Sequence, residues 1–145
     1  MVNVRKATIE DVPAIIRLIQ QFPEDEINVD WDKAAVACRE VVDDESKGSI
    51  FVAEEDGVLL GVVTQSFPYA TRCAGHYSCI EEIIVDGRAR GKGVGGKILK
   101  AAVNEATRRG CFELQVNRPS ELGYPMYIKH GFADLGKHLN MKLAR

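Results

Sequence analysis

The sequence predicts a single α/β domain in which a mixed, mostly antiparallel, twisted sheet carries helices on both faces. Two β-rich runs flank Asp56-Gly57, a dipeptide typical of tight hairpins. Apolar residues recur at helical spacing between Val12 and Phe22. A strand, a glycine-rich loop, a helix and a second strand follow one another over 80–116, which indicates a crossover between two parallel strands.

The first third of the chain is expected to form a strand and two helices. The strand covers 3–8, and Thr8 and Asp11 provide a cap for the helix that follows. A second helix is expected over 32–47, where Gly48 ends it. The polar stretch between the two helices is a connection.

The middle of the chain is expected to form the hairpin and the central strand. Strands over 49–54 and 58–67 pair across Asp56-Gly57. A loop over 68–78 leads into 79–85, a strand that is apolar on both faces apart from two glutamates.

The last third supplies the crossover and two smaller elements. A helix over 94–109 ends with two arginines and Gly110, as the negative end of a helix dipole favours. A strand over 111–116, a short helix over 120–130 and a last strand within 132–143 complete the expected order.

Size and composition exclude several classes of protein. The 145 residues, 46% of them hydrophobic, suffice for one domain over 1–145 with its own core. A net charge of −2 argues against a nucleic-acid partner. No apolar run approaches the ~20 residues that span a bilayer, and the first residues lack the core of a secretion signal. We therefore expect a cytoplasmic protein without a membrane partner.

The cysteines and histidines do not form a metal-binding pattern. The four cysteines show no C-x-x-C spacing, and the three histidines are scattered along the chain. The sequence predicts free thiols and no metal site.

The stretch RARGKGVGGKIL, residues 88–99, packs four glycines and four cations into twelve residues and indicates an anion site. Gly91, Gly93 and Gly96 fit the dinucleotide motif G-x-G-x-x-G, but about 80 residues precede it where the motif normally opens its domain. The same letters fit a P-loop until Ile98, which replaces the magnesium-binding hydroxyl.

The third interpretation rests on Arg90, Gly93 and Gly95, which fit [QR]-x-x-G-x-[GA] at the end of a strand and the start of a helix. This motif resembles the acyl-CoA-binding motif of the GNAT superfamily of N-acetyltransferases. The opening VRKATIEDVPAIIRLI, residues 4–19, resembles the first strand and helix of that family. MYIKHGF, residues 126–132, is similar to its late tyrosine-containing segment.

The resemblance implies the acyl-CoA N-acyltransferase fold and transfer of an acetyl group from acetyl-CoA to an amine. The amine attacks directly in a ternary complex, no metal takes part, and the family habit implies a homodimer. Backbone N–H groups of the glycine loop and the following helix N-terminus would face the pyrophosphate. The residues expected to bind the cofactor are Ile83, Ile84, Val85, Arg90, Gly91, Lys92, Gly93, Val94, Gly95, Gly96 and Asn117.

The resemblance also implies catalytic residues. Tyr127 would protonate the departing thiolate, as a phenol can in a dry site. Glu81 is the favoured base for the amine and Glu82 the alternative, because adjacent side chains of a strand point to opposite faces. Pro125 departs from the family pattern and disfavours helical backbone at Tyr124, which is therefore kept as a second candidate for the acid.

The acceptor is the least determined part of the function. We expect a small amine such as an amino sugar, a polyamine or an aminoglycoside-like compound. An acidic segment suits a cationic acceptor but is equally consistent with a solvated loop; its carboxylates are Glu24, Asp25, Glu26, Asp30 and Asp32. The alternatives are an acetyltransferase of protein N-termini or lysines, a non-catalytic acyl-CoA-binding or sensor domain, and a nucleotide-binding interaction module.

Overall fold

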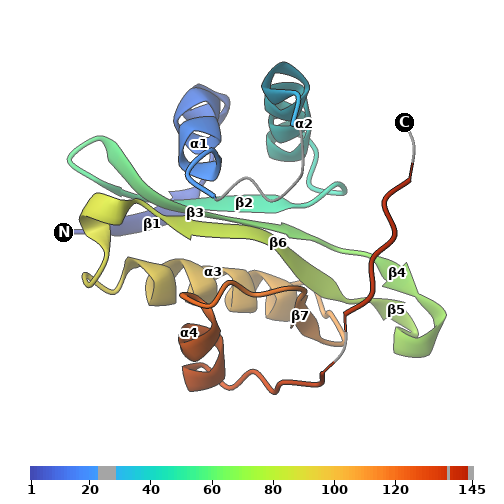
Figure 1. Cartoon of the computed structure of the whole chain (residues 1–145). Coiled ribbons are helices and arrows are strands. Elements are labelled where there is room, and N and C mark those ends of the chain that lie inside the picture. The colour runs from blue at the N-terminus through green and yellow to red at the C-terminus, as the bar shows by residue number, and fades with distance from the viewer. Residues whose placement is uncertain (23–28, 137, 144–145) are drawn as a thin grey trace.

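The computed structural model describes residues 1–22, 29–136 and 138–143. A five-stranded sheet with the order β1-β2-β3-β6-β7 separates α1 and α2 on one face from α3 and α4 on the other (Figure 1). The elements of the sheet and its helices are β1 (Asn3–Lys6), α1 (Val12–Ile19), α2 (Trp31–Asp43), β2 (Ser49–Glu55), β3 (Val58–Ser66), β6 (Ser78–Val85), α3 (Val94–Arg108), β7 (Leu114–Val116) and α4 (Tyr124–Lys129). Single 3₁₀ turns lie at η1 (Ile9–Asp11), η2 (Thr71–Cys73) and η3 (Gly87–Ala89).

The pairing of the strands confirms the predicted mixed sheet. β1, β2, β3 and β6 are successively antiparallel, whereas β7 runs parallel to β6. The parallel pairing joins only Ser78–Ile80 to Leu114–Val116. The second half of β6 is therefore paired on its β3 side and not with β7.

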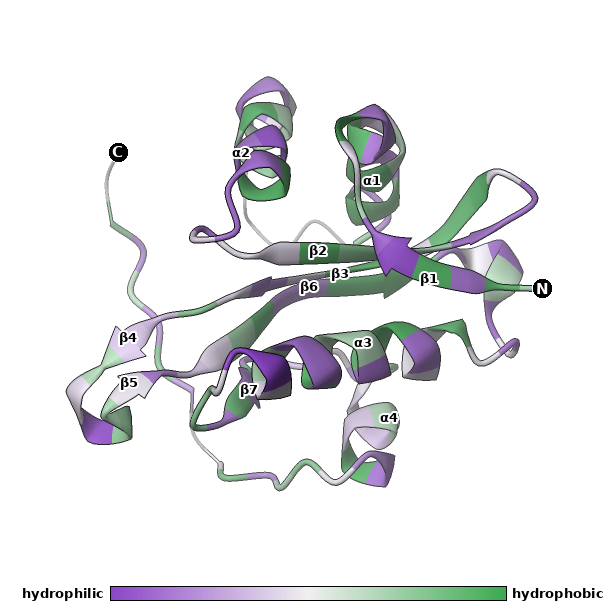
Figure 2. Cartoon of the chain, turned by 180° about the vertical axis from the view of Figure 1, so that it is seen from behind, coloured by the Kyte–Doolittle hydropathy of each residue, from purple (hydrophilic) through white to green (hydrophobic). Residues whose placement is uncertain are grey.

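Two apolar clusters hold the helices on the sheet. One lies between the sheet and α3 and contains Val63, Ile80, Ile98 and Leu99. The other lies under α1 and α2 and contains residues such as Ile15 and Val62. Figure 2 shows the hydrophobic side of α3 turned toward the sheet and the hydrophilic side turned away. This amphipathic pattern is the reason why the helical periodicity of the sequence predicts the layers correctly.

One buried polar group links the layers. Gln65 is 2% exposed, and its side-chain amide donates to Ser78 Oγ at 2.9 Å and to the Ala102 carbonyl oxygen at 3.2 Å. Its side-chain oxygen accepts from Ser49 Oγ at 3.1 Å. The network joins β2, β3, β6 and α3 at the end of the sheet from which β7 branches.

The chain start is fixed by a charged cap. Asp11 accepts from the Thr8 backbone N–H at 2.7 Å and from two nitrogens of Arg5 at 2.7 and 3.0 Å. Hydrogen bonds from Arg5 are the main reason that the pKa of Asp11 lies below its usual value. The expected cap at Thr8 and Asp11 is thus present.

The expectation of a last strand within 132–143 is wrong for the described part of that segment. Asp134 accepts from the Gly136 N–H and from the Tyr124 hydroxyl, both at 2.9 Å, and Gly136 has a φ of +99°. This turn leads the chain away from the sheet. Leu135, Leu139, Met141 and Leu143 are consequently 80–90% exposed.

Several element boundaries also differ from the predicted ones. The segment expected to be a loop over 68–78 contains a short hairpin, β4 (Tyr69–Ala70) with β5 (Gly75–His76), which projects from one end of the sheet (Figure 1). α4 begins only at Tyr124 because Pro125 occupies its first turn, where a missing N–H costs nothing. No helix in the described ranges is long and apolar enough to cross a membrane.

Candidate active site

The site begins where β6 and β7 separate. Glu82 and Asp86 direct their backbone N–H groups toward β3, to Thr64 Oγ1 at 3.1 Å and to the Leu60 carbonyl oxygen at 2.8 Å. Since successive N–H groups of a strand alternate in direction, those of Ile83 and Val85 point to the side that β7 has left. An extended ligand in this gap can pair with them as an added strand would.

A register shift in β6 lies at the start of the gap. Thr64 is opposite Glu82, but the next residue of β3, Gln65, is opposite Ile80. Glu81 is therefore the extra residue of a β-bulge, a feature that bends a strand and redirects side chains. The bulge gives the two glutamates different surroundings.

Glu82 is the more buried of the two glutamates. Thr64 Oγ1 donates a short hydrogen bond to its carboxylate. Burial raises the pKa of Glu82 above its usual value, the bond from Thr64 opposes that rise, and the nearby charge of Glu81 adds to it. The thiol of Cys38 on α2 has a pKa raised to about 11. Burial is the main cause, and the negative charge of Glu82 adds to it.

Glu81 is exposed and accepts from Ser66 Oγ at 2.5 Å. It also lies beside Cys79, whose pKa is raised to about 11, first by burial and then by Glu81. Of the two glutamates, Glu82 is the more buried one and the one whose pKa is raised.

The glycine loop follows β6 and runs through η3 into α3. Gly91 and Gly93 have φ values of +86° and +75°, a left-handed conformation that glycine adopts without strain. Gly93 is the N-cap of α3, so the first N–H groups of that helix point into the loop. Together these groups and the helix dipole form an anion site.

Two glycines of α3 allow α4 to pack closely against it. A Cβ on Gly95 would lie 2.9 Å from Met126 Sδ, and one on Gly96 would lie 3.3 Å from His130 Nε2. Side chains at these two positions would displace Met126 or His130, so both glycines allow the close contact between α3 and α4.

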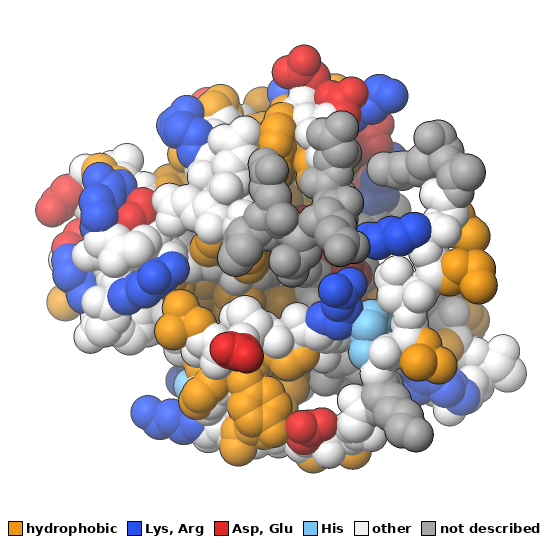
Figure 3. Space-filling model, in the orientation of Figure 1, with side chains coloured by type: hydrophobic (Ala, Val, Ile, Leu, Met, Phe, Trp, Pro, Cys, Tyr) orange, Lys and Arg blue, Asp and Glu red, His pale blue; other side chains and the backbone are white. Residues whose placement is uncertain are grey.

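A pocket of about 510 Å³ joins the gap to the glycine loop. Of the eleven residues predicted to bind the cofactor, nine line this pocket, and Lys92 and Asn117 do not. Figure 3 shows a hollow on this face of the molecule with hydrophobic side chains at its floor. The pocket brings together residues of the glycine loop and residues of β6 that lie outside the six-position motif.

Other lining residues were missed by the sequence interpretation. They come from the end of α1, from η3 and from the segment that enters α4: Gln21, Phe22, Ala89, Ser120, Leu122, Gly123 and Met126. No local motif marks these residues, because they reach the pocket only through the tertiary packing of α1 and α4. The position of Pro125 in the first turn of α4 was the one signal for where that helix begins.

The cations of the loop differ in availability. Arg88 donates to Asp86 from its backbone and side chain at 2.9–3.1 Å, and these bonds lower the pKa of Asp86 to about 2. Arg90 and Lys92 are exposed and form no ion pair with any residue in the described ranges. They are the cations of the loop that remain for an anionic ligand.

Tyr127 lies in the cluster on the α3 face of the sheet and is 3% exposed. Its ring packs edge-on against Phe132 with 5.3 Å between centroids, and burial raises its pKa to about 12. Within the described residues, the Tyr127 hydroxyl is not a buried group left without a hydrogen-bond partner. Tyr124 instead donates its hydroxyl to Asp134 and is 40% exposed.

Two further predicted features can be placed only in part. Asn117 follows β7 and its Nδ2 lies 3.5 Å from Cys79 Sγ, at the closed end of the gap rather than in the pocket. Of the acidic segment, Glu24, Asp25 and Glu26 lie outside the described residues. Asp30 caps α2 by accepting from the Lys33 N–H at 3.1 Å.

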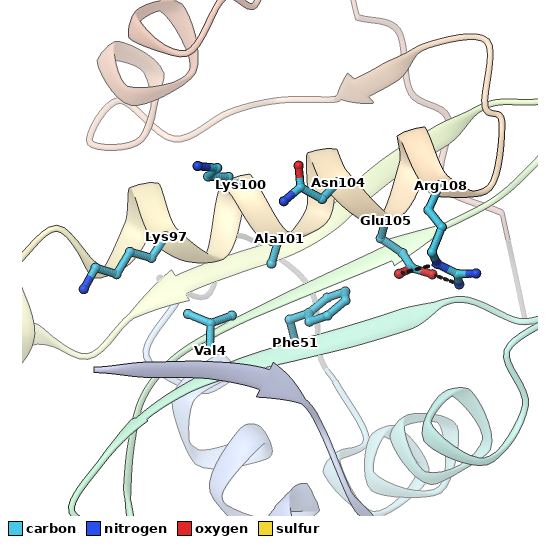
Figure 4. Close-up of a pocket in the computed structure, with 8 residues that line it drawn as sticks. All are labelled: Val4, Phe51, Lys97, Lys100, Ala101, Asn104, Glu105 and Arg108. Carbon is cyan, nitrogen blue, oxygen red and sulfur yellow. Dashed lines mark hydrogen bonds and ion pairs between the residues drawn. The ribbon is translucent and has the colours of Figure 1, made fainter. Parts of the chain in front are cut away.

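A second hollow of about 390 Å³ lies away from these residues, between α3 and the strands β1 and β2. Lys97, Lys100 and Arg108 lie along its helical side above Val4 and Phe51 (Figure 4). It contains none of the expected catalytic residues. Within the described ranges no group of three His, Cys, Asp or Glu could hold a metal ion.

A mixed sheet that opens between two parallel strands beside a helix N-terminus is the architecture of the α/β acyltransferase class. The model of the acetyltransferase (GNAT) family matches residues 13–132. The chain belongs to this family, as the resemblance in its motifs predicted, and it has the GNAT fold.

Three relatives illustrate the similarity. A predicted acetyltransferase from Clostridium acetobutylicum, solved with acetyl-CoA, superposes with a TM-score of 0.81 at 24% identity, covering 98% of this chain and 96% of that one. An uncharacterized N-acetyltransferase of Bacillus subtilis is 27% identical over 135 residues, 91% of this chain and 90% of the relative. Glucosamine 6-phosphate N-acetyltransferase 1 of rice (Oryza sativa subsp. japonica) is 34% identical over 84 residues, which cover 57% of this chain and 48% of the relative. The chain thus spans about half the length of this last relative.

Proposed function

We propose that the protein transfers an acetyl group from acetyl-CoA to a small primary amine. The observation that carries the proposal is the continuous pocket from the open side of β6 to the N-terminus of α3. An acyl-CoA has an extended amide-containing arm and a pyrophosphate, and the two parts of this pocket offer partners for each in that order.

The residues present fit this co-substrate. The backbone N–H groups of Ile83 and Val85 would pair with the pantetheine arm. The N–H groups around Gly91–Gly96 would hold the pyrophosphate, and Arg90 and Lys92 are free to meet the outer phosphates. The positive φ values of Gly91 and Gly93 support this binding mode.

The proposed base and the proposed acid lie on opposite faces of the sheet. Glu82 would take a proton from the attacking amine, because its raised pKa makes the carboxylate a stronger base than an exposed one. The amine nitrogen forms the new bond to the acetyl carbon as the carbon–sulfur bond breaks. Tyr127 would supply a proton to the thiolate, since its phenol is protonated throughout the neutral range.

The acceptor class is proposed on coarser grounds. The similarity to a glucosamine 6-phosphate N-acetyltransferase and the two glutamates of β6 favour a small amine, with amino sugars and polyamines as the compounds to try. A protein N-terminus or lysine is the second candidate, and a binding domain without turnover the third.

Ligand-induced stabilisation tests the cofactor assignment. Acetyl-CoA, NAD and ATP are added separately, and the unfolding temperature is measured. Acetyl-CoA at about 100 times its Kd is expected to stabilise by ~2.7 kcal/mol, which raises the Tm by several degrees. Arg90→Ala should reduce that shift, whereas Lys100→Ala in the second hollow should leave it unchanged. A shift with NAD or ATP alone would contradict the proposal.

The rate as a function of pH tests the base. Coenzyme A formed with glucosamine 6-phosphate, spermidine or kanamycin is measured by chromatography, because the free cysteines would react with a thiol reagent. The rate should rise with pH as Glu82 loses its proton, and Glu82→Gln should remove that rise. Glu81→Gln is the matched control and should retain it. The reverse pattern would assign the base to Glu81.

A further inference from the structure

Two hydroxyl groups of β3 lie next to the two glutamates of β6. Thr64 Oγ1 donates a short hydrogen bond to the Glu82 carboxylate, and Ser66 Oγ donates to the Glu81 carboxylate at 2.5 Å. Thr64 and Ser66 are two residues apart in one strand, so their side chains point to the same face of the sheet. The bulge at Glu81 therefore brings both carboxylates to one face, although the two glutamates are adjacent in the sequence.

This face of the sheet is the one that α1 and α2 cover. Val62 and Ile84 lie two residues from Thr64 and Glu82 along their strands, and both belong to the cluster under these helices. Burial and then the charge of Glu82 raise the pKa of the Cys38 thiol on α2, which places the carboxylate on the same side. Thr64 and the proposed base thus share the face opposite to the proposed acid.

The Thr64 hydroxyl binds Glu82 twice. Oγ1 accepts from the Glu82 backbone N–H at 3.1 Å and donates its only proton to Glu82 Oε2. Thr64 is 9% exposed, and the β-branched side chain has little rotational freedom in a strand. The backbone and the carboxylate of Glu82 are therefore tied to each other through one oxygen atom.

The other carboxylate oxygen of Glu82 stays accessible. Glu82 Oε1 forms no hydrogen bond with a described residue. Among the described residues that are not exposed, Arg109 Nη2 is the only fully buried side-chain atom without a partner, so Oε1 is not fully buried. Thr64 consequently holds one oxygen of the carboxylate and leaves the second one open to a ligand.

The charged groups around this carboxylate do not neutralise it. Glu81 on the same strand is negative, and Cys38 is the titratable group on α2 that the carboxylate influences. β3 contains no charged residue, and α1 contains only Arg17. None of the ion pairs within the described ranges involves Glu82. The hydroxyl of Thr64 is thus the described group that favours the charged form of Glu82.

We propose that Thr64 is a positioning residue for the base: its hydroxyl keeps the Glu82 carboxylate ionised and directs Oε1 toward the attacking amine. The inference rests on the proposed function, in which Glu82 receives a proton from that amine. The amine proton goes to Oε1 as the new carbon–nitrogen bond forms. Thr64 keeps its own proton, which remains in the bond to Oε2.

The rate of coenzyme A formation as a function of pH tests this role with a set of variants. Thr64→Val replaces the hydroxyl by a methyl group of similar size. The rise of the rate should move to higher pH, and the rate on the acidic side of that rise should fall about tenfold, because a hydrogen bond to a charged group is lost. Thr64→Ser keeps a hydroxyl and should restore the wild-type profile.

Ser66→Ala is the matched control for the pH profile. It removes the equivalent hydroxyl from Glu81 and should leave the position of the rise unchanged. Circular dichroism shows whether each variant is folded. A wild-type profile in Thr64→Val, or the same displacement in Thr64→Ser as in Thr64→Val, would overturn the proposal.

Carbon-13 NMR of glutamate-labelled protein tests the same bond without turnover. The Glu82 carboxyl signal, assigned by its loss in Glu82→Gln, should titrate at higher pH in Thr64→Val than in the wild type or Thr64→Ser. Identical titration in all three proteins would overturn the proposal. A displaced titration in a chain that forms no coenzyme A with any amine would support the hold of Thr64 on Glu82 and contradict the proposed function instead.

Discussion

Replacement of Tyr127 by phenylalanine separates its structural contribution from its chemical one. The ring is 3% exposed and packs against Phe132, and Phe keeps both contacts. The hydroxyl forms no hydrogen bond with a described residue and is not a fully buried unpartnered group, so its removal should change the free energy of unfolding by less than about 1 kcal/mol. Loss of a general acid typically lowers turnover by ~10²–10⁴-fold, equivalent to ~2.7–5.4 kcal/mol of transition-state stabilisation.

The assay for this prediction measures kcat by coenzyme A formation and acetyl-CoA affinity by calorimetry. We expect kcat to fall within that range while Kd for acetyl-CoA stays within about twofold, because the hydroxyl acts only on the departing sulfur. Tyr124→Phe is the control: it removes the bond to Asp134 at an exposed position and should retain turnover. Turnover of Tyr127→Phe within about threefold of the wild type, or an equal fall in Tyr124→Phe, would refute the role of Tyr127.

Three further substitutions separate effects on acetyl-CoA affinity from effects on stability. Gly95→Ala places a Cβ 2.9 Å from Met126 Sδ, and we expect the flexible Met126 side chain to move into the pocket. The Tm should therefore stay unchanged in a thermal melt. The Kd for acetyl-CoA, measured by calorimetry, should rise about tenfold, which corresponds to ~1.4 kcal/mol. Gly61→Ala places a Cβ 3.0 Å from Val94 Cγ1 and 3.2 Å from the Ile84 carbonyl oxygen. Both neighbours are packed in the core, so a urea melt should show a loss of about 1–3 kcal/mol in the free energy of unfolding. Asp11→Asn should cost about 1.5–3 kcal/mol at neutral pH. Because folding lowers the pKa of Asp11, the wild-type advantage is present above the ordinary value of 3.8 and fades as pH falls through the folded value, which melts across pH 2–7 would follow.

The layers and the glycine loop were predictable because each depends on local chemistry. Helical spacing of apolar residues predicted α1, two arginines and Gly110 predicted the end of α3, and Asp56-Gly57 predicted the hairpin of β2 and β3. Gly91 and Gly93 have positive φ values, which glycine adopts more readily than any other residue, so the loop could be interpreted from its sequence.

The remainder of the site depends on packing that a local pattern does not encode. The choice between Glu81 and Glu82 turns on a bulge between Thr64 and Gln65, and a one-residue shift exchanges the two faces of a strand. The sequence interpretation favoured Glu81, whereas the surroundings of Glu82 suit a base better. The last strand expected within 132–143 is absent from the described residues, because the turn at Asp134 and Gly136 leads the chain away from the sheet.

The short pairing of β6 with β7 also determines how the protein should respond to hydrogen exchange. The amides of Ile83 and Val85 face a gap, so they should exchange rapidly although they lie in a central strand. Acetyl-CoA bound in the gap would slow hydrogen exchange at the amides of Ile83 and Val85. The amides that point toward β3 would exchange slowly with or without it. Substrate binding would then complete the sheet, and the rigidity of its middle would depend on the supply of acetyl-CoA.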